Sequence, residues 1–207
     1  INNFIKNNSK LIWKDAIGSD HRINGAEYIS KEINGSLDRL INFTENIGKI
    51  YLKQDISLFM VMANRTIQKK NNHGSGNGWH KDSYSRQFKS ILYLNDVTKN
   101  NGPFQIIKNS TKNLFMFNLF LKLKNKFPNT RFSDEEILKI LNNKRDEIID
   151  LIGKAGTLIL VDTSNLHRGK PLEFGERYAL TNYFYPKIIF DDHKDHFKPK
   201  LDNYINS

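Results

Sequence analysis

The sequence predicts one domain that is mainly β, with helices flanking a sandwich or barrel. Short segments rich in β-branched and aromatic residues alternate with turns rich in glycine and asparagine, which is typical of such folds and not of βαβ units. The 207 residues suffice for a single domain with a real core. The 38% of hydrophobic and 26% of charged residues are typical of a globular protein and not of a disordered chain.

Five segments carry the strand pattern. In chain order they are "ISLFMVMANRTI" (56–67), "FKSILYLNDV" (88–97), "PFQIIK" (103–108), "GTLILVD" (156–162) and "RYALTNYFYP" (177–186). The stretches "NNHGSGNG", "TKNNG", "GKAG" and "EFGE" separate them as turns. We therefore expect residues 56–110 and 148–186 to form the β core.

Helical spacing occurs on either side of the first strands. Residues 1–55 read as a mainly helical support, with Ser36 as the N-cap of "SLDRLINFTENIGKIYL". Residues 111–147 form a helical insertion, in which Ser133 and Glu136 make a capping box. An insertion of this kind serves either as a lid or as packing on the outside of the barrel. Residues 187–207 read as a polar tail.

Composition excludes several classes of protein. The chain has no cysteine, so a metal must be held by histidine or carboxylate side chains. The net charge of +10 comes mostly from scattered lysines, which favours a solvated surface and makes nucleic-acid binding the least favoured function. No apolar run approaches the roughly 18 residues of a membrane helix, and no leader pattern is seen, so we expect a cytoplasmic protein without a membrane span.

The stretch "GNGWHKDSY" places His80 and Asp82 two residues apart. In a strand, such residues point to the same face about 6–7 Å apart, so both side chains can reach one metal ion. Alone the pair is a weak signal, because it also arises by chance in a chain with 6 histidines and 22 acidic residues.

His167, in "VDTSNLHRGKP", is the candidate for a third ligand. If an antiparallel strand brings it beside His80 and Asp82, two histidines and one carboxylate occupy one face of the metal. That arrangement indicates a non-haem Fe(II) oxygenase. The alternative is that the three residues are ordinary strand and turn residues of a barrel without this chemistry.

Four motifs in order resemble the phytanoyl-CoA dioxygenase family of Fe(II)- and 2-oxoglutarate-dependent oxygenases. They are "WHKD", "YLNDVTKNNGPFQIIKNSTK", "GTLILVDTSNLHRGKP" and "GERYAL", and they lie between Ser57 and Pro186. The chain departs from the family pattern at Lys108 and Asn109, where Pro-Gly is usual, at Lys112, where the family often has histidine, and at Ile91, where it often has tryptophan. The resemblance implies a double-stranded β-helix, that is, a cupin-like jelly roll, with the site at its open end.

The resemblance also implies roles for individual residues. His80, Asp82 and His167 would bind Fe(II), and Arg177 would bind the distal carboxylate of 2-oxoglutarate. A planar guanidinium suits that task, because it donates two parallel hydrogen bonds to a carboxylate. Tyr93 would add a hydroxyl contact to 2-oxoglutarate, unless its hydroxyl has another buried partner.

Two further residues, Met62 and Asn64, share a strand face and are weaker candidates for the same pocket. The retained carboxylate at Asp82 favours hydroxylation, because related halogenases replace it with a small residue. The expected reaction consumes O2 and 2-oxoglutarate, hydroxylates a C–H bond of a small molecule or a carrier- or sugar-linked metabolite, and releases succinate and CO2. Basic residues in the flanking segments permit an anionic substrate. The alternative function is a jelly-roll binding module or a cupin-type metal isomerase.

Overall fold

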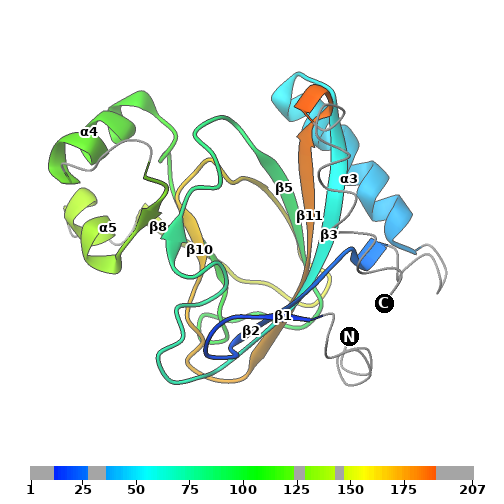
Figure 1. Ribbon diagram of the computed structural model, residues 1–207, viewed down its shortest axis with the longest axis horizontal. Helices are drawn as coiled ribbons and strands as arrows, with labels where there is room; N and C mark the ends of the chain where they lie inside the picture. Colours follow the sequence, from blue (N-terminus) through cyan, green and yellow to red (C-terminus); the bar gives the residue numbers. More distant parts are fainter. Residues whose placement is uncertain (1–11, 28–35, 124–128, 143–146, 190–207) are drawn as a thin grey trace.

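Two antiparallel sheets stacked face to face form the frame of the molecule, seen here in a computed structural model (Figure 1). The structure describes residues 12–27, 36–123, 129–142 and 147–189. The larger sheet contains, in spatial order, β1 (Trp13–Lys14), β2 (Asp20–Asn24), β3 (Ile56–Ile67), β11 (Glu176–Pro186), β5 (Phe88–Tyr93) and β9 (Leu158–Asp162). The smaller sheet contains β7 (Arg131–Phe132), β4 (Trp79–His80), β10 (His167–Gly169), β6 (Phe104–Ile107) and β8 (Ile148–Leu151).

The predicted jelly roll is confirmed. All five predicted strands are present as β3, β5, β6, β9 and β11. The last strand, β11, lies between β3 and β5, so strands more than 80 residues apart in the sequence are neighbours in the sheet. The shorter strands β4, β7, β8 and β10 were not predicted, because segments of two to four residues are too short to show a periodic pattern.

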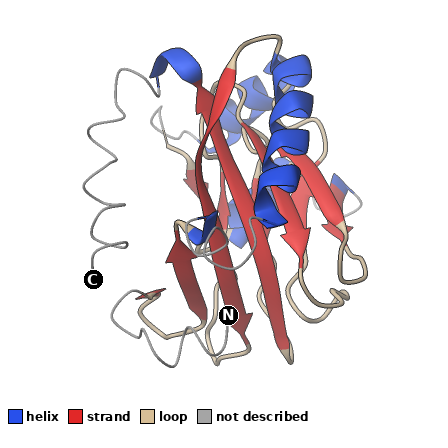
Figure 2. Cartoon of the chain, turned by 90° about the vertical axis from the view of Figure 1, so that its right-hand side faces the viewer, coloured by secondary structure: helices blue, strands red, loops and turns tan. Residues whose placement is uncertain are grey.

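Helix α3 (Ser36–Leu52) covers the outer face of the larger sheet (Figure 2). Ile41 packs with Val61 and Ile23 in one apolar cluster, and Ile47 packs against a second cluster that contains Ile56 and Phe88. Since the helix buries this face, the opposite face of the sheet is left to line the interior between the two sheets.

Within residues 1–55 the structure also contains strands, where the sequence was read as mainly helical. Strand β2 pairs along its whole length with β3, and β1 extends the sheet beyond it. The sequence did not predict β2, because its residues, "DHRIN", show no apolar alternation. Its inner face carries Asp20 and Arg22, so the face that a sequence pattern would expect to be apolar is charged.

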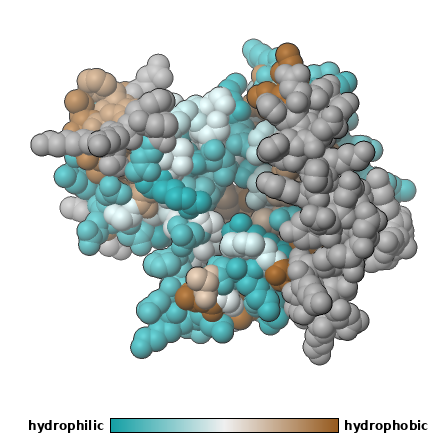
Figure 3. Space-filling view, in the orientation of Figure 1, coloured by the Kyte–Doolittle hydropathy of each residue, from teal (hydrophilic) through white to brown (hydrophobic). Residues whose placement is uncertain are grey.

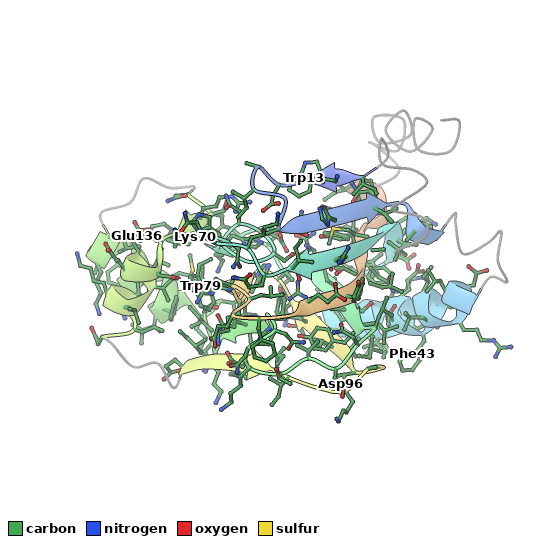
Figure 4. The ribbon with its side chains drawn as sticks, turned by 90° about the horizontal axis from the view of Figure 1, so that it is seen from below. Trp13, Phe43, Lys70, Trp79, Asp96 and Glu136 are labelled. Atoms are coloured by element: carbon green, nitrogen blue, oxygen red, sulfur yellow. The ribbon has the colours of Figure 1, made fainter. Side chains whose placement is uncertain are left out.

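In the described part of the insertion, residues 111–123, 129–142 and 147, strand β7 pairs with β4 at the edge of the smaller sheet and the helices pack against the outside of that sheet. Helices α4 (Asn113–Leu123) and α5 (Asp134–Ile140) contribute Leu119, Ile137 and Ile140 to a cluster with Trp79. In Figure 4, Trp79 lies on the side of the molecule that carries α5 and Glu136, opposite α3 and Phe43. The predicted capping box is present, because the Ser133 hydroxyl accepts from the Glu136 N–H and the Glu136 carboxylate accepts from the Ser133 N–H.

None of the helices among the described residues is long and apolar enough to cross a membrane. Of the predicted tail, only residues 187–189 belong to the described part of the chain.

Candidate metal centre

His80 and His167 lie directly opposite each other in the smaller sheet. His80 ends β4, His167 begins β10, and the register pairs their Cα atoms, with the ring centroids 4.3 Å apart. One potential ligand atom from each of His80, Asp82 and His167 lies within 4.8 Å of the other two. The three residues singled out in the sequence are thus brought together between the two sheets.

Both imidazole rings are oriented by backbone carbonyl groups. The Nδ1 atoms of His80 and His167 lie 2.8 Å from the carbonyl oxygens of Gly78 and Asn165, respectively. Burial lowers the pKa of both rings, and for His167 the neighbouring His80 lowers it further, which favours the neutral form. A neutral ring that donates from Nδ1 keeps the lone pair of Nε2 for a metal, so the hydrogen bonds select the ligating tautomer.

The sequence suggested that Asp82 lies in a strand with His80. In the structure Asp82 lies just beyond the end of β4 and is not in a paired strand. Its N–H donates to the carbonyl oxygen of Thr163, at 3.1 Å, which holds the residue beside the histidines. The residue is exposed as a whole, yet its side chain is only 20% exposed. Burial raises the pKa of the carboxyl, but the Lys89 ammonium at 2.7 Å and His167 outweigh this, and the pKa falls to about 2.

The loop before His80 closes one side of the site. Gly76 has a φ of +85°, and a Cβ at this position would overlap the imidazole of His80. The neighbouring Ser75 accepts a hydrogen bond of 2.9 Å from the N–H of Gly169, at the end of β10. The glycine-rich run is therefore a wall that packs on the histidine, and glycine is required for that close approach.

The donor set fits a divalent transition metal. Two neutral imidazole nitrogens and one ionised carboxylate suit iron(II), and ligands confined to one face leave the remaining coordination positions to co-substrate. Backbone contacts orient both rings, and Lys89 holds the carboxylate, so these three side chains have the supporting hydrogen bonds that metal ligands require.

Arg177 lines the same cavity from β11 of the larger sheet. Its side chain is buried, with the residue 5% exposed, and Nη1 donates to the carbonyl oxygen of Gly102. The Nε atom has no hydrogen-bond partner, and within the described ranges no carboxylate forms an ion pair with this guanidinium. Burial lowers the pKa of Arg177, and Tyr93 and Asp20 oppose this only in part, which indicates that an anionic ligand completes the site.

Tyr93 is buried and is not among the residues that line the cavity. Its hydroxyl donates to the carbonyl oxygen of Leu151 at 2.8 Å and accepts from the N–H of Phe104 at 2.9 Å. These bonds join β5 to β6 and β8, across the two sheets. The geometry favours this structural role for the hydroxyl, and a contact with 2-oxoglutarate stays a prediction.

The cavity between the sheets has a volume of about 190 Å³. Figure 3 shows the molecule hollowed near the centre of this face, with a mainly hydrophilic border. Met62 and Asn64, the weaker candidates from the sequence, both line the cavity. Sequence reasoning missed three basic residues of the wall, which are Arg22, Lys89 and Arg131. Lys89 could have been found, because it shares a strand face with Ile91.

A jelly roll that holds two histidines and one carboxylate beside a buried arginine defines a class of non-haem iron proteins. The comparison with known families agrees, since the profile of the 2OG-Fe(II) oxygenase superfamily matches residues 63–185. The chain belongs to this superfamily, whose cofactors are Fe(II) and 2-oxoglutarate, with O2 as oxidant. A search of curated protein sequences found no match.

Three proteins illustrate the solved structures of similar fold. EctD from S. alaskensis with bound Fe shares 16% identity at a TM-score of 0.59, over 89% of this chain and 65% of that one. HygX from Streptomyces hygroscopicus, with nickel and 2-oxoglutarate bound, shares 14% identity at a TM-score of 0.55, over 89% of this chain and 77% of that one. The non-haem α-ketoglutarate-dependent epimerase SnoN from nogalamycin biosynthesis shares 14% identity at a TM-score of 0.56, over 84% of this chain and 65% of that one. The chain thus spans less than two thirds of the length of EctD and SnoN, and at these identities the likeness establishes the fold.

Proposed function

We propose that this protein is a hydroxylase in which His80, Asp82 and His167 bind Fe(II) and Arg177 binds the distal carboxylate of 2-oxoglutarate. The single observation that carries the proposal is Arg177, a buried cation that has no carboxylate partner in the described part of the chain and faces the cavity of the His-Asp-His set. Leaving such a charge unpaired costs several kcal/mol, so we expect a ligand to supply the anion.

The residues of the chain hold and aim the reactants. Bound iron and 2-oxoglutarate supply the oxidising chemistry, in which O2 is consumed and 2-oxoglutarate leaves as succinate and CO2. The carbonyl groups of Gly78 and Asn165 fix the ring orientation of the two histidines. Arg177 fixes the far end of 2-oxoglutarate, and the apolar side chains of Phe104 and Ala179 limit water beside it.

Hydroxylation of a small molecule, or of a carrier- or sugar-linked metabolite, is the outcome that we favour. Asp82 supports it, because the carboxylate occupies the position that a halide needs in related halogenases. We also place the chain in the phytanoyl-CoA dioxygenase family within the superfamily, on the strength of the ordered motifs between Ser57 and Pro186. SnoN is described as an epimerase, so product analysis is required to distinguish hydroxylation from epimerisation.

The test is a 2-oxoglutarate binding titration with Ni(II) in place of Fe(II). We expect metal-dependent binding in the wild type and a loss of about 100-fold in affinity in Arg177→Gln, since two charge-assisted hydrogen bonds are removed. Arg65→Gln is the matched control, because Arg65 pairs with Glu176 and does not line the cavity. Absence of metal-dependent binding, or an Arg177→Gln variant that binds like the wild type, would contradict the proposal. Succinate formation with Fe(II) and candidate substrates then measures turnover.

A further inference from the structure

The cavity wall carries positive charge that bound Fe(II) and 2-oxoglutarate would not neutralise. Four cationic side chains line it, namely Arg22, Lys89, Arg131 and Arg177. Among the described lining residues, Asp82 is the only carboxylate. An excess of charge of one sign inside a cavity favours ligands of the opposite sign.

Two of these cations are already balanced. Fe(II), the carboxylate of Asp82, the two carboxylates of 2-oxoglutarate and the guanidinium of Arg177 together carry no net charge. Arg22 donates from Nε and Nη2 to one carboxylate oxygen of Asp20, at 2.9 and 2.6 Å, and is neutralised by it. Arg131 and Lys89 are left, and the one carboxylate that Lys89 contacts, Asp82, is already counted with the metal, so the loaded cavity keeps a net positive charge of two.

Lys89 is placed for a ligand other than 2-oxoglutarate. It is 6% exposed, and its Nζ lies 2.7 Å from Asp82 and 3.9 Å from the centre of the Tyr183 ring. In the sheet Lys89 is the register partner of Tyr183, six residues along β11 from Arg177, which corresponds to about 20 Å. Along β11, Arg177 and Tyr183 are the first and last residues that line the cavity, so the two cations start from opposite ends of it, with Lys89 against the metal ligand Asp82.

Arg131 reaches the cavity from the smaller sheet. It is the register partner of His80, and its Nη1 donates to the carbonyl oxygen of Gly76 at 2.8 Å, which ties the side chain to the loop wall. An exposed arginine alone would be ordinary. Here it comes from the 111–147 insertion and lines the same cavity as the buried Lys89. Arg131 is paired with the metal ligand His80 and Lys89 lies against the metal ligand Asp82, so both cations adjoin the metal site.

We propose that the primary substrate bears an anionic group, a phosphate or a carboxylate, and that Lys89 and Arg131 bind this group while the rest of the molecule faces the metal. The inference rests on the proposed function, because it assumes that 2-oxoglutarate is held by Arg177. A guanidinium and an ammonium from two sheets converge on an anion with charge-assisted hydrogen bonds, which orients the substrate as well as binding it.

The experiment uses the protein loaded with Ni(II) and saturating 2-oxoglutarate, titrated with three probes in a calorimeter. The probes are glycerol 3-phosphate, 3-hydroxypropanoate and neutral glycerol. We expect saturable binding of at least one anion, none of glycerol, and at least a tenfold weaker anion affinity in Arg131→Gln and in Lys89→Met. The anion that binds more tightly identifies the group as phosphate or carboxylate. In Arg131→Gln the Kd of 2-oxoglutarate should change less than twofold.

Arg65→Gln is again the control, because it removes the same charge outside the cavity and should change anion affinity less than twofold. The inference is overturned if neither anion binds the loaded wild type, if Arg131→Gln binds anions like the wild type, or if Arg65→Gln weakens them equally. These results would leave the proposed function intact when 2-oxoglutarate still binds. If the wild type does not bind 2-oxoglutarate, both proposals fail.

Discussion

Lys89 gives Asp82 a partner besides the metal. The ammonium of Lys89 contacts one carboxylate oxygen of Asp82 and also the ring of Tyr183. The carboxylate is therefore held ionised and in one orientation. Such supporting contacts commonly contribute 10–100-fold to metal affinity. The Lys89 side chain therefore has a role at the metal even before a substrate is present.

Replacing Lys89 by methionine should weaken Ni(II) binding by about tenfold, because the carboxylate loses its charged hydrogen-bond donor while the apolar stem is kept. The Kd for Ni(II), measured by calorimetry without 2-oxoglutarate, reports the change. Lys154→Met is the control, since Lys154 is exposed and pairs with Asp96 on the surface. Equal affinities in a folded Lys89→Met variant would show that Asp82 does not need this partner.

The two roles of Tyr93 can be separated by a single atom. Tyr93→Phe removes the hydroxyl, so the N–H of Phe104 and the carbonyl oxygen of Leu151 each lose their hydrogen bond to it. We expect a loss of about 1–3 kcal/mol in the free energy of unfolding, measured by chemical denaturation. The Kd of 2-oxoglutarate should change less than twofold. A large loss of 2-oxoglutarate affinity at unchanged stability would instead support the cofactor contact predicted from the sequence.

At the scale of elements, strands that combine length with β-branched and aromatic residues were predicted closely. The predicted range 56–67 is the range of β3, and the predicted start of β11 differs by one residue. The strands that carry His80 and His167 were assumed in the argument for a metal site and not found from a local pattern, because β4 and β10 are two and three residues long and pair with each other, with β6 and with β7. Short strands depend on their partners, which a local pattern does not contain.

Helix α5 tests the role of the insertion. Ser133→Ala removes the N-cap, which should cost about 1 kcal/mol in the free energy of unfolding. Because Ile137 and Ile140 pack on the outside of the smaller sheet, we expect unchanged 2-oxoglutarate affinity. Denaturant unfolding and a 2-oxoglutarate titration give the two values. A variant of normal stability with weakened 2-oxoglutarate binding would favour a lid instead.

At the scale of the whole molecule, the metal ligands tie distant parts of the chain together. His80 and Asp82 are more than eighty residues from His167, and the cavity that they share is closed by the larger sheet. A ligand that binds only the folded chain stabilises it by about 2.7 kcal/mol at a concentration of 100 Kd. The metal should therefore stabilise the entire fold.

Ni(II) at about 100 times its Kd should raise the Tm of the wild type by several degrees. The increase in the Tm of His167→Ala should be much smaller. Differential scanning calorimetry measures both, and EDTA should reverse the increase. Comparable increases in the two proteins would place the bound ion elsewhere.

The sequence by itself determined the class of fold, the residue types that suit iron, and the superfamily, because strand patterns and ordered motifs are local properties of the chain. Only the tertiary structure decided that His80, Asp82 and His167 meet, that Arg177 is buried without a carboxylate partner in the described chain, and that Lys89 and Arg131 share the cavity. The physical reason is that burial, pairing and charge balance depend on which residues become neighbours in space. A lysine and an arginine that look like ordinary surface charges in the sequence become a site when two sheets close around them.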